Sequence, residues 1–208
     1  MLQLFPAAPQ RHKWLTIHPL LTPEAGQLDF ELMPDAVAAG TLKVTEVGSG
    51  TVPELLAINE GERDVLVLDG MQFIGARQNR MASRTILLPA GSQTKIPVNC
   101  MEQGRWHSVS DTFAPSVNHS PSRVRRKNKE LEYMNVMGGV SADARSLSQA
   151  QSSVWEEIGF HSRDLGVGSS TGNLDEIARG RAEDLGEWVR AFPPVEGQVG
   201  ILAFLGPD

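Results

Sequence analysis

The sequence lacks the features of a secreted or membrane-spanning protein. Its 208 residues include a single cysteine, so no internal disulfide can form, which is typical of a reducing compartment. No run approaches the roughly 18 apolar residues that a membrane helix requires. The first residues show neither the basic nor the apolar segment of a secretory signal. We therefore expect a cytoplasmic protein that does not bind membranes.

Motifs for several kinds of chemistry are also missing. The five histidines show no two-ligand helical spacing and no Cys-x-x-Cys pair accompanies them, so we expect no metal site. There is no Gly-x-Ser-x-Gly elbow and no Gly-x-x-x-x-Gly-Lys loop, so serine-hydrolase and P-loop chemistry have no support. The glycine-rich stretch 166–172 does not have the spacing of the dinucleotide fingerprint. Helix capping explains it better than an anion site, and we expect no cofactor.

What is present is the composition of one globular domain. Hydrophobic residues make up 40% of the chain and charged residues 21%, and 208 residues can bury a substantial core. The net charge of −6 argues against a general nucleic-acid binder. Five of the 19 basic residues nevertheless lie within Ser122–Lys129. We interpret that segment as a solvated loop entering a charged helix, with phosphate binding as the alternative.

The first 106 residues are predicted to be rich in strands. Apolar or β-branched runs occur at 15–20, 42–47, 55–58, 65–68, 71–74, 85–88 and 95–98, with a short helix at 33–40. Asp69-Gly70 suits both left-handed positions of a two-residue turn, so we expect 65–68 and 71–74 to form a hairpin. A second strand pair is expected around residues 89–92. Short strands with tight turns favour an antiparallel sheet over a parallel one.

The second half differs in character. Residues 107–145 are rich in Ser, Pro, Asn, Arg and Gly and are predicted to be a long, partly ordered loop. A helix is expected over 147–165, with a capping box at 148–151, and another over 174–189, with a cap at Asn173. A buried-looking strand at 198–205 follows. We thus predict a single domain over 1–208, with a β-rich region over 1–106, a loop over 107–145, and helices and a final strand in 146–205. A turn signal after that strand predicts a C-terminally truncated sequence.

The fold class that these patterns predict is α+β. We expect an antiparallel β-sandwich or barrel-like core, with two helices of the C-terminal half packed on it.

Two polar blocks interrupt the strand-like region. They lie between Gly75 and Arg80 and between Cys100 and Trp106. Their candidate site residues are Arg77, Gln78, Asn79, Arg80, Cys100, Glu102, Arg105 and Trp106. Such side chains are costly to bury without partners. They form either a site mounted on a sheet or an internal polar network.

Each residue type indicates a role. The arginines suit carboxylate or phosphate, and neighbouring side-chain amides suit a polar ligand. Glu102 is either an ion-pair partner or a general base. Cys100 is a nucleophile only if its pKa is lowered, and a nearby carboxylate raises it, so a small core residue is the commoner outcome. Trp106 either stacks on a ligand ring or covers the core.

These same blocks resemble a bacterial, largely uncharacterised family, the ARG- and rhodanese-phosphatase-superfamily-associated protein domain. The resemblance is carried by Leu68-Asp-Gly70, the Gly-x-x-Gln-Asn-Arg block at 75–80, and the Ile-Pro-Val-x-Cys-x-Glu-x-x-Arg-Trp block at 96–106. The family's association with ADP-ribosylglycohydrolase-type proteins implies a role in ADP-ribose or NAD-derived metabolism. It makes the polar blocks the candidate pocket.

We therefore expect a soluble domain that binds or processes an ADP-ribose-like, NAD-derived or other phosphorylated nucleotide through an Arg/Gln/Asn/Glu pocket, with Glu102 and Cys100 as candidate catalytic groups. The alternative is a non-catalytic binding or regulatory module whose polar cluster is structural. The expected partner is a small nucleotide-like molecule, not a membrane or nucleic acid. The sequence determines neither an enzymatic reaction nor an oligomeric state.

Overall fold

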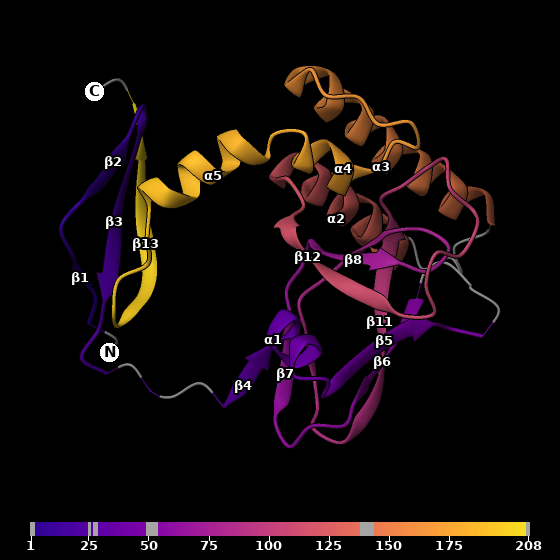
Figure 1. The fold of residues 1–208 in the computed structure, drawn as a ribbon, viewed down its shortest axis with the longest axis horizontal. Coiled ribbons are helices and arrows are strands. Elements are labelled where there is room, and N and C mark those ends of the chain that lie inside the picture. The colour runs from indigo at the N-terminus through magenta and orange to yellow at the C-terminus, as the bar shows by residue number, and fades with distance from the viewer. Residues whose placement is uncertain (1–2, 25, 27–28, 49–53, 138–143, 207–208) are drawn as a thin grey trace. The chain divides into compact units, whose positions relative to one another are not determined.

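A computed structural model describes residues 3–24, 26, 29–48, 54–137 and 144–206, apart from the side chains of 131–150. Across these ranges there are 13 strands and five helices (Figure 1). All strand pairs but one are antiparallel, the exception being β4 (Phe30–Leu32) with β7 (Asp64–Val67). The predicted α+β class with a largely antiparallel core is confirmed. No helix in the described ranges is long and apolar enough to cross a membrane.

The chain divides into two compact units, and the single domain over 1–208 stays a prediction. One unit combines residues 1–28 with 181–208, and the other is 29–180. The division arises because β13 (Gln198–Leu205) pairs along β3 (Leu15–Leu21) and so joins two distant segments in one sheet. Local sequence patterns do not report such a long-range pairing.

The larger unit contains two sheets. The six-stranded sheet has the order β12 (Phe113–His119), β8 (Met71–Gly75), β9 (Arg80–Ala82), β11 (Ser92–Cys100), β6 (Glu54–Asn59) and β5 (Leu42–Glu46). The three-stranded sheet has the order β10 (Ile86–Leu88), β7, β4. Helix α1 (Met33–Ala38) follows β4 directly and corresponds to the short helix predicted at 33–40. Pro34 lies in its first turn, where proline is well tolerated.

One hydrophobic cluster lies between these two sheets and α1. Strand β6 alternates half-buried and buried positions, so Leu55 and Ala57 face the core while their neighbours do not. Val65 and Val67 do the same in β7. The two inner faces therefore form the sandwich-like core that the alternation predicts.

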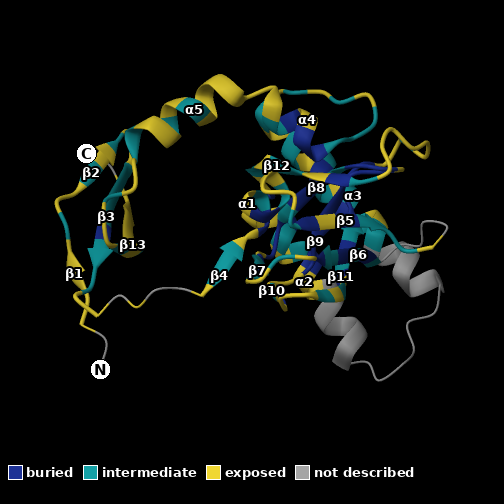
Figure 2. Ribbon diagram, turned by 60° about the horizontal axis from the view of Figure 1, so that its bottom comes forward, coloured by how far each residue is buried: buried dark blue, intermediate teal, exposed yellow. Residues whose placement is uncertain are grey.

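A second cluster lies where three helices cover the six-stranded sheet. The helices are α2 (Ser122–Met137), α3 (Ala144–Leu165) and α4 (Leu174–Arg179), which Figure 1 shows grouped beside β8 and β12. The buried members are Met81, Met101, Val124, Val154, Ile158, Leu174 and Ile177. Figure 2 shows buried residues in dark blue on α4 and on the strands near it. The cluster fastens the helices to the end of the sheet that carries the polar blocks.

The predicted hairpin at Asp69-Gly70 is wrong. Strand β7 pairs with β10 and β4, whereas β8 pairs with β9 and β12. The turn itself is present, because the Met71 amide donates to the Leu68 carbonyl at 3.0 Å. Gly70 has φ 85°, but Asp69 does not adopt a positive φ. A turn in which only the second central residue has a positive φ does not match the twist of a two-residue hairpin, and here it carries the chain from one sheet to the other.

Two further predictions are corrected by long-range pairing. Strands β10 and β11 do not pair with each other, since β10 pairs with β7 and β11 with β6 and then β9. The predicted loop 107–145 contains strand β12 and helix α2. Phe113 of β12 pairs with Gly75 of β8, a tertiary contact that organises a segment with little periodicity of its own.

The helices also differ from their predicted bounds. Helix α3 begins at Ala144, so the expected capping box at 148–151 lies inside it. The helix predicted over 174–189 is two helices, α4 and α5 (Ala182–Ala191). The predicted cap at Asn173 is confirmed, because its side chain accepts a hydrogen bond from the Asp175 amide at 3.0 Å.

The smaller unit is a four-stranded sheet with one helix. On one edge β3 pairs with β1 (Phe5–Pro6) and β2 (Gln10–His12), and on the other with β13. Helix α5 contacts this sheet through Trp188, whose ring centroid lies 4.8 Å from that of His12. The large apolar residues of β13 are exposed, whereas the sequence pattern indicated a buried strand.

Candidate functional site

The two polar blocks come together in the larger unit. One forms the β8–β9 connection and the other follows β11, and the Gln78 side chain donates to the Glu102 carbonyl at 2.8 Å. Most of the predicted site residues are buried there, namely Gln78, Asn79, Arg80, Cys100 and Glu102. These five residues of the two blocks therefore lie inside the fold.

Glu102 is the centre of this cluster. Its Oε2 accepts from Arg105 Nη2 at 2.7 Å and from the Asn79 amide at 3.2 Å. Its Oε1 accepts from Thr171 Oγ1 at 2.9 Å. Burial by itself raises the pKa of Glu102, but the hydrogen bonds from Arg105, Asn79 and Thr171 outweigh it and hold the pKa below the ordinary value of 4.5. Glu102 is thus a charged, fully engaged carboxylate.

Arg105 uses its remaining donors to hold the β8–β9 connection. Nη1 donates to the Ala76 carbonyl at 2.6 Å and Nη2 to Asn79 Oδ1 at 3.0 Å. Asn79 Oδ1 also accepts from the Gly75 amide at 3.0 Å. Ala76 has φ 42°, a strained conformation for a residue with a Cβ. The ion pair of Glu102 and Arg105 therefore stabilises a connection that is unfavourable alone.

Arg80 and Cys100 form a second region of the cluster. Arg80 Nη1 donates to Gln78 Oε1 at 2.9 Å and contacts Cys100 Sγ, and Nη2 lies 4.0 Å from Glu46 Oε2. Burial raises the pKa of Cys100 to about 11, although Arg80 lowers it and Glu46 adds to the rise. The group is a thiol at neutral pH, so its surroundings do not support a nucleophile.

The two remaining candidates lie outside the network. Trp106 is 62% exposed, and Arg77 is exposed as well. The stretch 166–172 is hydrogen-bonded to the second block, because the Thr171 carbonyl accepts from the backbone amides of Gln103 and Gly104. The backbone of this stretch thus makes hydrogen bonds within the protein at Thr171. The hydrogen bonds of this network join protein groups to one another, and a structural, ligand-binding or catalytic role for its members stays a prediction.

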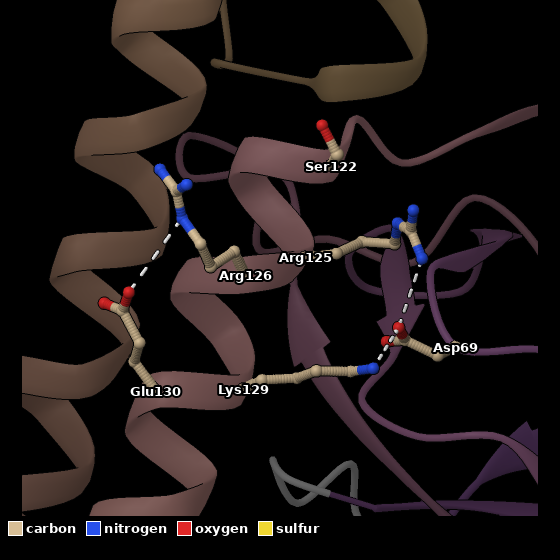
Figure 3. A pocket seen from close by; sticks show the side chains of 6 residues that line it. All are labelled: Asp69, Ser122, Arg125, Arg126, Lys129 and Glu130. Carbon is tan, nitrogen blue, oxygen red and sulfur yellow. Dashed lines mark hydrogen bonds and ion pairs between the residues drawn. The ribbon is translucent and has the colours of Figure 1, made fainter. Parts of the chain in front are cut away.

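A different set of side chains surrounds an open hollow. Asp69, Ser122, Arg125, Arg126, Lys129 and Glu130 line a space of about 430 Å³ (Figure 3). Arg125 Nη1 and Lys129 Nζ lie 3.3 Å and 2.9 Å from Asp69 Oδ2. Figure 3 shows both cationic side chains reaching from α2 to the same carboxylate. Three cations and two carboxylates face this space, so its lining carries a positive surplus.

Helix α2 and the turn at residues 68–71 build this hollow together. The lining residues of α2 recur at spacings of three and four, which places them on one helix face. The turn lies close because Ser120 N donates to the Gly70 carbonyl at 3.0 Å. A Cβ on Gly70 would lie 2.2 Å from Arg125 Cδ. Glycine at this position is therefore what lets Arg125 reach Asp69.

Some residues of this hollow stand out in the sequence alone. The sequence indicates that the basic segment 122–129 is a solvated loop entering a charged helix, with phosphate binding as the alternative, and it indicates that Asp69 is a turn residue. The spacing of Ser122, Arg125 and Lys129 is the signal that indicates one helix face. Their meeting with Asp69 depends on the tertiary fold, because 56 residues separate Asp69 from Arg125.

Comparison with known proteins assigns the chain to a protein family. A family model described as the ARG and Rhodanese-Phosphatase-superfamily-associated Protein domain matches residues 3–208. No curated protein and no solved structure matches the chain.

Proposed function

The chain belongs to the ARG and Rhodanese-Phosphatase-superfamily-associated Protein domain family, and from this premise we propose that it binds a phosphorylated, nucleotide-like ligand such as ADP-ribose in the basic hollow beside Asp69. The observation that carries the proposal is the convergence of Arg125 and Lys129 on one open space, with Arg126 at its rim. Guanidinium and ammonium groups are the side chains that bind phosphate.

The size and accessibility of the hollow fit such a ligand. Its volume of about 430 Å³ falls within the roughly 300–1,000 Å³ of small-molecule sites. The side chains of Arg125 and Lys129 are 33% and 58% exposed, so each is in part accessible from solvent. The exposed Ser122 adds a hydroxyl at the first residue of α2, where helix amides attract anions.

In this proposal the buried Arg/Gln/Asn/Glu cluster is structural. The donors of Arg105 and both carboxylate oxygens of Glu102 are engaged with protein groups. This observation favours a binding module over catalysis by Glu102 or Cys100. The cluster's role is to fix the sheet end against which the helices pack.

The test is calorimetric titration of the whole chain with ADP-ribose. Lys129→Ala is expected to weaken binding roughly tenfold or more, because a hydrogen bond to a charged group contributes about 1.5–3 kcal/mol. The matched control is Lys95→Ala. Lys95 is 60% exposed and pairs with Glu54 at 2.7 Å, as Lys129 is 58% exposed and pairs with Asp69 at 2.9 Å, but it lies outside the hollow.

The control variant is expected to bind like the unaltered chain. An equal loss of affinity for ADP-ribose in Lys129→Ala and Lys95→Ala would contradict the proposal. So would a folded, unaltered protein that does not bind ADP-ribose.

A further inference from the structure

Asp69 has hydrogen-bonding capacity that its protein neighbours leave unused. The side chain is only 8% exposed, and both of its cationic partners approach Oδ2. Oδ1 is buried and has no hydrogen-bond partner among the described residues. Most buried polar atoms in folded proteins are paired, so an unpaired carboxylate oxygen on a residue that lines a hollow calls for a partner.

A donor on the cationic side of the hollow is also without a hydrogen-bond partner. Arg125 Nε is buried and has no partner within the described ranges of the chain. An unused acceptor and an unused donor thus belong to two residues whose charged groups, Asp69 Oδ2 and Arg125 Nη1, are 3.3 Å apart. A ligand that satisfies both must combine a hydrogen-bond donor with an acceptor, and an anion is the acceptor that pairs best with a guanidinium group.

The kind of donor follows from charge. A carboxylate accepts hydrogen bonds and repels a phosphate, so the phosphate must lie on the side of Arg125 and Lys129. An ammonium donor would meet those same two cations, which disfavours it. A neutral hydroxyl meets neither objection, because it can donate to Oδ1 without adding charge.

The distance between the phosphate and the hydroxyl of the ligand narrows the class of ligand further. Arg125 and Lys129 both lie within hydrogen-bond reach of one carboxylate. A phosphate that contacts them is therefore close to Asp69, and the hydroxyl must follow the phosphate within a few bonds. A sugar phosphate has this arrangement.

We propose, on the basis of the function proposed above, that the hollow recognises a phosphorylated sugar, with Asp69 accepting a hydrogen bond from a sugar hydroxyl while Arg125 and Lys129 bind the phosphate. Asp69 is then a specificity residue, since it separates sugar phosphates from other organic phosphates of equal charge.

The experiment compares two probes of equal charge on the whole chain, ribose 5-phosphate and n-butyl phosphate. The unaltered protein is expected to bind ribose 5-phosphate about tenfold more tightly, the effect of one hydrogen bond to a charged group. Asp69→Asn keeps the shape and removes the charge, and is expected to reduce this preference to about twofold without weakening n-butyl phosphate. Asp64→Asn is the matched control, because Asp64 accepts a hydrogen bond from the Ala90 amide outside the hollow.

The outcomes separate the two proposals. Equal affinity of the unaltered chain for both probes overturns the role of Asp69 and leaves the phosphate site standing. Full preference in folded Asp69→Asn overturns that role too. Binding of neither probe overturns the phosphate site itself. The comparison of probes on the unaltered chain keeps the inference testable if Asp69→Asn does not fold.

Discussion

Glu102 has the surroundings of a group that stabilises the fold. Its carboxylate is paired with Arg105, which is itself almost enclosed, and both oxygens accept hydrogen bonds. Pairing of this kind is not necessarily better than an apolar core, but the loss of one partner leaves a buried charge uncompensated. The residue is therefore sensitive to small chemical changes.

We predict that Glu102→Gln lowers the free energy of unfolding by about 3 kcal/mol, because Arg105 keeps its charge and loses its partner. Urea denaturation at neutral pH measures the change. Glu54→Gln, at an exposed pair with Lys95, is the control and is expected to cost less than about 1 kcal/mol. A small effect of Glu102→Gln would show that the network is not needed for stability.

The same variant has a predicted dependence on pH. The pKa of Glu102 is lower in the folded chain than its ordinary 4.5, so its stabilising contribution is complete above about pH 4.5 and is lost as the pH falls through the folded pKa. The stability of the unaltered protein therefore falls more steeply in acid than that of Glu102→Gln. Parallel curves for the two proteins would contradict this assignment.

At the scale of elements, the turn at residues 68–71 links the two sheets to helix α2. Gly70 adopts φ 85°, and its missing side chain leaves room for Arg125. The turn thus determines both the change of sheet and the position of a cation that faces the hollow.

Gly70→Ala is expected to lower the free energy of unfolding by about 1–2 kcal/mol at least, the approximate cost of a left-handed conformation for alanine, and to weaken ligand binding as Arg125 moves. Gly40→Ala is the matched control, because Gly40 has φ 76° and no atom within 4 Å of the added Cβ. It is expected to show the backbone cost alone. Calorimetric titration of both variants separates strain from displacement, and equal binding by the two would exclude displacement of Arg125.

At the scale of the whole molecule, the hydrophobic clusters formed by the described residues lie in the larger unit. Every buried member of the two clusters lies between Met33 and Ile177. In the smaller unit, the described large apolar residues of β13 are exposed. A unit of about this size buries too little apolar surface for much stability of its own.

We predict that a fragment of residues 29–180 folds without the smaller unit, because it contains both hydrophobic clusters and the hollow. Far-UV circular dichroism during heating is expected to show one cooperative transition. The joined segments 1–28 and 181–208, made as one chain with a short linker, are expected to show none. A fragment 29–180 without a transition would mean that its core depends on contacts with the smaller unit.

The positions of most elements follow from the sequence, because alternation and helical spacing are local properties. The final strand over 198–205, the short helix after residue 32 and the cap at Asn173 are present as predicted. The partners of the strands were not predictable in the same way. β7 and β8 adjoin in sequence yet pair with other strands, since pairing depends on contacts between distant segments.

The candidate site shows the same division. The sequence by itself determined that polar residues accumulate in the two blocks and that five basic residues lie in 122–129. Only the tertiary structure decided which group is buried and which faces solvent. The first is enclosed because β11 and the helices cover it, and the second is open because α2 turns its basic face to Asp69 across the 68–71 turn. Burial depends on all neighbours in space, and a sequence specifies only the neighbours along the chain.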